Sequence, residues 1–187
     1  QSLVVNTAGD LVVLGTTGSD NFPVTSGRKF EGGEDVEPIQ GIRYLGGTDL
    51  FVARLSADGT RLVAGTYLGG SRNDGINFIE GSMFTSFHTE SPLARNYGDQ
   101  ERGDVITDVQ DNVFIASVTA STDFPVVNTS TDADFGGGHL DGVVAKLSAD
   151  LNSIQWTRLV GGTGEDAEQQ LPDLPLPERL APAGQVR

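Results

Sequence analysis

Short apolar runs separated by glycine-rich polar segments follow one another along the chain, for example at residues 11–14 and 50–53. Such runs are typical of short strands, and glycine-rich breaks are typical of tight turns. The chain holds 25 glycines, several of them in pairs, which supports many turns and argues against long helices. The pattern also excludes disorder throughout, because these apolar runs need burial.

The pattern occurs in two copies. The Phe-Pro-Val triplet at residues 22–24 recurs at residues 124–126, and residues 3–24 align with residues 105–126 without a gap. Internal repetition of this kind is typical of proteins built from repeated structural units. Matched polar positions in this block are Thr17 with Thr119 and Ser19 with Ser121.

A second block repeats more strongly. Residues 49–74 align with residues 141–166, so that Gly69, Gly70 and Asp74 stand opposite Gly161, Gly162 and Asp166. The first copy has more residues between its two blocks, all within the polar stretch 25–48. Length variation at one place in a repeat is typical of a surface loop.

Each copy is predicted to form four strands. The expected strands are residues 3–6, 11–17, 50–56 and 61–68 in the first copy, and 105–108, 113–119, 142–148 and 153–160 in the second. Residues 8–10 suit a tight hairpin, and Gly59 can take positive φ in the second hairpin turn. In the second copy we expect Asn152 to take the place of Gly59.

The inner strands are near-continuous apolar runs, which predicts burial on both faces. A single four-stranded sheet does not provide that, whereas a sheet wedged between two like sheets does. This is the packing of propeller blades. The predicted fold is all-β, a partial β-propeller built of four-stranded antiparallel blades.

Several motifs also match a known repeat. They are residues 9–15, 21–23, 49–56, 58–59 and 66–71 in the first copy, and 111–117, 123–125, 141–148 and 161–162 in the second. Over residues 3–75 and 104–167 they resemble the bacterial SBBP β-propeller repeat family. The resemblance implies a propeller from a secreted or cell-surface protein that acts in adhesion, surface assembly or ligand display.

The chain therefore divides into four parts. They are a first blade at residues 1–75 with a loop insertion at 25–48, an inter-blade insertion at 76–103, a second blade at 104–167, and a proline-rich tail or linker at 168–187. A propeller closes with about four to eight blades. We therefore expect further blades, from the same chain or from other protein chains, as partners.

The net charge of the chain further limits the classes of partner that it is expected to bind. The formal net charge is −14, which disfavours nucleic acid and anionic membranes, because both require Lys and Arg. No apolar stretch is long enough for membrane insertion. The chain has no cysteine, so disulfides and thiolate metal sites are excluded.

We expect no cofactor, and calcium is the one ion that the acidic composition keeps open. Asp132 and Asp134 precede three glycines as in the start of a calcium loop, but the downstream Glu of an EF-hand is missing. Asp166 ends a Gly-Gly-x-Gly-x-Asp stretch that partly matches a calcium-binding nonapeptide, and a propeller turn explains the same residues. No metal ligand is therefore assigned.

No catalytic motif stands out, and no catalytic or cofactor-binding residue is assigned. His88 and His139 lie in different loops, without the further ligands of a zinc site or the elbow of a serine hydrolase. Trp156 replaces Ala64 of the first copy and either fills an inter-blade gap or stacks on a carbohydrate. The expected function is a non-catalytic interaction module.

Two alternatives remain open at this stage. The chain is part of a propeller hydrolase or lyase for polysaccharide or peptide, whose active site lies mostly in other blades. Otherwise it is a subunit of a larger extracellular assembly, in which partner chains complete the ring.

Overall fold

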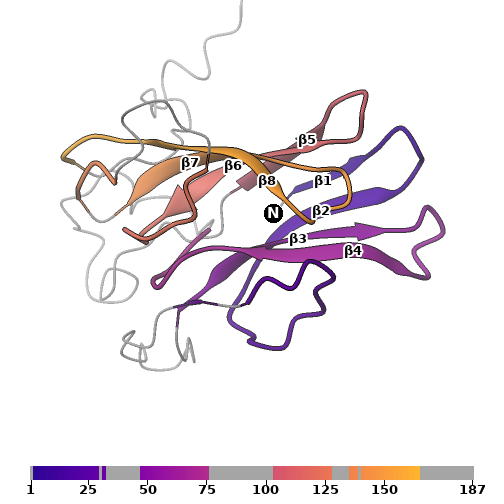
Figure 1. The fold of residues 1–187 in the computed structure, drawn as a ribbon, viewed down its shortest axis with the longest axis horizontal. Coiled ribbons are helices and arrows are strands. Elements are labelled where there is room, and N and C mark those ends of the chain that lie inside the picture. The colour runs from indigo at the N-terminus through magenta and orange to yellow at the C-terminus, as the bar shows by residue number, and fades with distance from the viewer. Residues whose placement is uncertain are drawn as a thin grey trace, which may run out of the picture.

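In the part of the chain that the structure describes, the protein is all-β and forms two four-stranded antiparallel sheets (Figure 1). The computed structural model describes residues 2–29, 31–32, 47–75, 103–127, 135–138 and 140–164. Within these residues there are eight strands and no helix. Each sheet is formed by one of the two sequence copies, and its strands lie in chain order.

The strands form where the apolar runs predict them. Sheet A holds β1 (Ser2–Val5), β2 (Leu11–Thr17), β3 (Asp49–Leu55) and β4 (Leu62–Leu68). Sheet B holds β5 (Gly103–Thr107), β6 (Val113–Thr119), β7 (Asp141–Leu147) and β8 (Ile154–Val160). The predicted strands are confirmed, with ends that shift by one or two residues. Gly103, assigned to the insertion from the sequence, is the first residue of β5.

Two hairpin turns show how the copies differ. Gly9 and Gly59 have φ of 83° and 70°, as expected for glycine in these turns. Their counterparts in the second copy are Asp111 and Leu151, with φ of 62° and 57°. The prediction that Asn152 takes this conformation is wrong.

Burial explains the choice of Leu151. Its side chain is only 1% exposed and belongs to the main hydrophobic cluster. The left-handed conformation costs a non-glycine residue about 1–2 kcal/mol, which is less than the gain from burying a leucine of about 1.5–3 kcal/mol. Asn152 is exposed and has no such gain.

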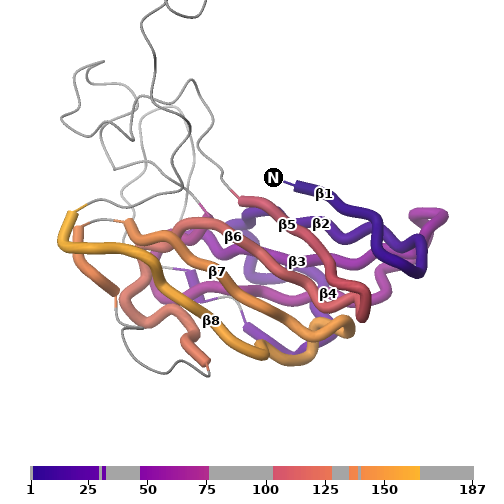
Figure 2. The backbone as a smooth tube through the Cα atoms, turned by 90° about the horizontal axis from the view of Figure 1, so that it is seen from above, coloured from indigo at the N-terminus to yellow at the C-terminus, as the bar shows by residue number. Residues whose placement is uncertain are grey.

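The two sheets pack face to face, with β5 against β1 and β2 (Figures 1 and 2). We call the face of each sheet that meets the other sheet its inner face, and the opposite face its outer face. One hydrophobic cluster spans both inner faces. Its fully buried members include Val12, Leu14, Leu50, Val52 and Leu68 of sheet A, and Val105, Val113, Ile115, Val143, Ala145 and Leu147 of sheet B.

The outer faces are less buried, and that of sheet B carries Asp104, Lys146 and Arg158 among its apolar residues. In β7, for example, buried residues alternate with half-buried ones along the strand. The central strands were expected to be buried on both faces. In the described residues their apolar side chains are buried on the inner face, while the other face has only partial cover.

Candidate functional site

The loop after β4 joins the two sheets. Residues 69–75 dock on the end of β6 and on the residues that follow it, and Asp74 forms an isolated antiparallel bridge with Thr119. The Gly75 amide donates to the Val118 carbonyl at 2.8 Å, and the Ala120 amide donates to the Asn73 carbonyl at 2.9 Å. These main-chain bonds hold the end of one unit against the next. We call this contact the junction.

The Asp74 carboxylate lies at the centre of the junction and is fully buried. The Thr119 hydroxyl donates to Oδ1, and the Ser121 hydroxyl donates to Oδ2 at 3.0 Å. The Gly70 amide also donates to Oδ2, at 2.8 Å. Three donors, two of them from the second unit, therefore surround one carboxyl group from the first unit.

A second buried carboxyl group lies beside it. Asp49, the first residue of β3, is fully buried, and its Oδ2 accepts the Glu31 amide at 2.9 Å. Among the described residues its Oδ1 has no hydrogen-bond partner. A Cβ placed on Gly69 would overlap with Asp49 Oδ1 and lie 2.7 Å from Asp74 Oδ2, so both carboxyl groups meet at this glycine.

Burial changes the acidity of both groups. Desolvation raises the pKa of Asp74 to about 7, although the hydrogen bonds from Thr119, Gly70 and Ser121 oppose the shift. Desolvation also raises the pKa of Asp49 to about 6, and the nearby Glu31 and Asp123 carboxylates add to the shift. Loss of water costs the charged form of a carboxyl group more free energy than it costs the neutral form. Both carboxyl groups at the junction are therefore partly protonated at a higher pH than an ordinary carboxyl group.

A third carboxylate, that of Asp123, lies at the edge of the junction. Its Oδ1 accepts the Ser71 amide at 2.9 Å and the Ser71 hydroxyl at 3.0 Å. These bonds, with the amide first, hold the pKa of Asp123 below its ordinary value. The Ser121 hydroxyl oxygen in turn accepts the Arg72 amide at 2.9 Å.

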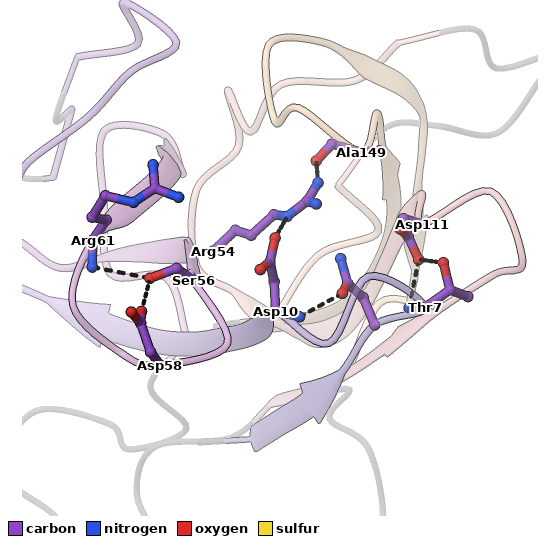
Figure 3. A network of polar contacts seen from close by, with 9 residues as sticks. Thr7, Asp10, Arg54, Ser56, Asp58, Arg61, Asp111 and Ala149 are labelled. Atoms are coloured by element: carbon purple, nitrogen blue, oxygen red, sulfur yellow. Dashed lines mark hydrogen bonds and ion pairs between the residues drawn. The ribbon is translucent and has the colours of Figure 1, made fainter.

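A second polar contact joins the sheets at the other end of β3 (Figure 3). Arg54 pairs through Nε with Asp10 Oδ2 at 2.7 Å, and its Nη1 donates to the Ala149 carbonyl of the second unit at 3.1 Å. Nearby, the Thr7 amide and hydroxyl both donate to Asp111 Oδ1 at 2.8 Å. The two sheets are thus tied at both ends.

Aligning the two copies shows that unlike faces meet. Leu3, Val13 and Ala53 lie on the outer face of sheet A, in register with one another. Their counterparts in sheet B are Val105, Ile115 and Ala145, which lie on its inner face. The sheets therefore stack head to tail, so that the equivalent faces of sheets A and B point in the same direction.

The predicted candidates mostly fall outside the described residues. These are Asp132, Asp134 and Asp166 for calcium, and the two histidines His88 and His139. Within the described ranges no three His, Asp or Glu side chains are arranged to hold a metal ion. That part of the chain also contains no helix with the length and apolar character needed to span a membrane.

Trp156 lies on the outer face of sheet B. Its ring meets the edge of Phe114 at a centroid distance of 6.1 Å, and Lys146 Nζ lies 4.6 Å from the Phe114 ring centre. It does not lie between the two described sheets. Its side chain is half-buried, so part of the indole remains accessible.

Sequence reasoning did not identify Asp74, Thr119 and Ser121 as a contact. The signal was present, because Asp74 recurs as Asp166 and the Thr-x-Ser pair occurs in both copies.

A scan against models of known protein families finds no match, and no curated protein matches the chain.

Proposed function

We propose that this chain is a non-catalytic interaction module of a secreted or cell-surface β-propeller, with blades as a rigid scaffold and loops for contacts. The SBBP repeat family, which the repeat motifs resemble, supplies the extracellular setting of this proposal. The loops in question are residues 25–48, 76–103 and 127–140.

The observation that carries the proposal is the head-to-tail stacking of two like sheets. In a propeller every blade presents one face to its predecessor and the other to its successor. The two sheets follow this rule. Val105 and Ile115 of sheet B lie on the face that meets sheet A, whereas their counterparts Leu3 and Val13 lie on the face of sheet A that points away from sheet B. Stacking of this type continues until the rotation closes a ring or a capping element ends it.

The buried carboxyl groups support a structural role for the junction. Perturbed pKa values are common at catalytic sites, but buried structural networks also produce them. Asp74 is enclosed by three donors and has no exposed surface. A substrate has no access to it while the units stay packed.

Two measurements on the native polypeptide that carries this sequence test the proposal. Denaturing mass spectrometry should give a mass well above 19.7 kDa, because a ring needs more units. Incubation with polysaccharide and peptide panels should give binding without turnover. A mass near 19.7 kDa would contradict a closed single-chain propeller, and turnover would contradict the non-catalytic role.

A further inference from the structure

The first unit carries a copy of the hydroxyl pair that holds Asp74. Thr17 ends β2 and Ser19 comes two residues later, as Thr119 ends β6 and Ser121 comes two residues later. In both pairs the serine amide donates to the threonine Oγ1, at 3.1 Å in the first unit and 2.9 Å in the second. We call Thr17 and Ser19 the open pair, and Thr119 and Ser121 the covered pair.

The two pairs differ in what lies against them. The covered pair is fully buried, and its hydroxyls donate to the Asp74 carboxyl group of the neighbouring unit. In the open pair Thr17 is half-exposed and Ser19 is exposed, and among the described residues no carboxyl group accepts from either hydroxyl. The open pair therefore has the donors of the junction and lacks its acceptor.

The outer face of sheet A, beside the open pair, repeats an apolar face that is covered in sheet B. Leu3 is 57% exposed, whereas its counterpart Val105 is 4% exposed. Val13 is half-buried, whereas its counterpart Ile115 is 1% exposed. No sheet among the described residues covers the outer face of sheet A. Apolar side chains exposed on adjacent strands are typical of an interaction surface.

The turn between β3 and β4 repeats a further part of the contact. Arg54 donates to the Ala149 carbonyl across the two sheets, and the counterpart of Ala149 in the first unit is Ala57. Ala57 is exposed, whereas Ala149 is half-buried. The basic side chain is also repeated, because Lys146 stands at the position of Arg54. A neighbour built on the same repeat therefore brings a donor for the Ala57 carbonyl.

We propose that the open pair and the outer face of sheet A form the docking surface for a further four-stranded unit of the same polypeptide, which places a loop carboxyl group between the two hydroxyls and a basic side chain on the Ala57 carbonyl. This inference rests on the proposed function and names the partner of this face and the contacts that hold it. The interface continues the described one, because the partner presents to sheet A what sheet A presents to sheet B.

The carboxyl group is the distinctive part of this partner. A unit with an apolar face alone would bury the two hydroxyls of the open pair without an acceptor, which destabilises the contact. A loop carboxyl group satisfies both donors, as the Asp74 carboxyl group does at the covered pair. The partner is therefore recognised by one acidic residue together with its apolar face.

Thiol labelling of the native polypeptide that carries this sequence tests whether the face is covered. The sequence has no cysteine, so Leu3→Cys places one new thiol in it, and peptide mass spectrometry locates the label. Thr122→Cys gives the rate of an exposed thiol, and Val105→Cys gives the rate at the described interface. Maleimide should label Leu3→Cys about tenfold or more slowly than Thr122→Cys, because a covered thiol reacts only when the units separate.

Removing the hydroxyls tests the carboxyl contact. Thr17→Val with Ser19→Ala removes both donors, so labelling of Leu3→Cys should accelerate about tenfold or more while labelling of Val105→Cys stays slow. The same two changes at the covered pair, read with Val105→Cys, are the matched reference, because the carboxyl acceptor is observed there. Acceleration at the covered pair without acceleration at the open pair would overturn the inference.

The inference and the proposed function fail in different ways. Slow labelling of Leu3→Cys that does not respond to loss of the hydroxyls would overturn the carboxyl contact and leave the propeller standing. Labelling as fast as that of Thr122→Cys would overturn the docking and also the continued stacking on which the proposed function rests. Turnover of a substrate would contradict only the non-catalytic role.

Discussion

At the scale of single residues, the tightest packing at the junction is that of a glycine on two carboxyl groups. A Cβ at Gly69 would overlap with Asp49 Oδ1 and crowd Asp74 Oδ2, and the equivalent Gly161 has the same relation to Asp141. Gly69 is therefore required for the space it leaves, and not for positive φ. The first glycine of the Gly-Gly pair in each copy follows from this close approach.

The change Gly69→Ala should destabilise the protein by about 1–3 kcal/mol, the usual cost of forcing extra atoms into a packed region. Urea unfolding followed by circular dichroism measures the loss. Gly164→Ala is the control, since a Cβ there meets nothing within 4 Å. Equal stability of the two variants would show that the Asp49 carboxyl group does not lie against Gly69.

Leu151 gives a second residue-level test. Leu151→Gly removes the strain of positive φ but also a side chain that is 1% exposed. Burial is the larger quantity, so we expect a net loss of about 1–3 kcal/mol, whereas Asn152→Gly should change stability little. Thermal unfolding of both variants measures this. Stabilisation by Leu151→Gly would contradict the account of the turn.

At the scale of elements, the strands could be predicted from the sequence, whereas the repeat marks Asp74, Thr119 and Ser121 without showing that they contact one another. Apolar runs bounded by turn residues place β2, β3, β6 and β7 to within one residue, because burial and turn geometry act locally. The role of Asp74 depends on Thr119 and Ser121, which belong to another unit and approach only after the sheets pack. The turn at Leu151 was missed for a similar reason, since its burial depends on the assembled core.

The junction should make stability depend on pH. In the folded state the pKa of Asp74 is raised to about 7 and that of Asp49 to about 6, from 3.8 for the ordinary carboxyl group. Their protonated forms are favoured on folding, so this stabilisation is complete below pH 3.8 and is lost as the pH rises through about 6 and 7. The melting temperature should therefore fall between pH 5 and pH 8.

Asp74→Asn should flatten that fall, because the amide imitates the neutral carboxyl group in shape and does not ionise. Differential scanning calorimetry across this pH range measures the difference. Asp20→Asn, at an exposed position, should keep the unaltered profile. If Asp74→Asn kept the full fall in melting temperature, ionisation of Asp74 would not be its cause.

Two carboxylates in the hairpin turns give the stability of the protein the opposite dependence on pH. The Ser56 hydroxyl and other donors lower the pKa of Asp58 to about 2, and Asn112 and other donors do the same for Asp108. Stabilisation by these groups is present above pH 3.8 and is lost as the pH falls toward 2. The decline at acid pH should therefore persist in Asp74→Asn.

At the scale of the whole molecule, two like sheets are packed in one direction and leave unlike apolar faces at the two ends. Leu3 and Val5 are exposed at one end, and Ile106 and Val160 at the other. Exposed apolar side chains on neighbouring strands are typical of interaction surfaces, and in the proposed propeller further blades would cover them. The repeat in the sequence predicted like units, whereas the direction of packing emerges only from the register of the strands.

The most direct test of this account is electron microscopy of the native polypeptide that carries this sequence. We expect a ring of more than two four-stranded sheets around a central channel, with the outer faces of sheets A and B each covered by a further sheet. A particle in which these two sheets stand alone, with both outer faces in solvent, would contradict the account.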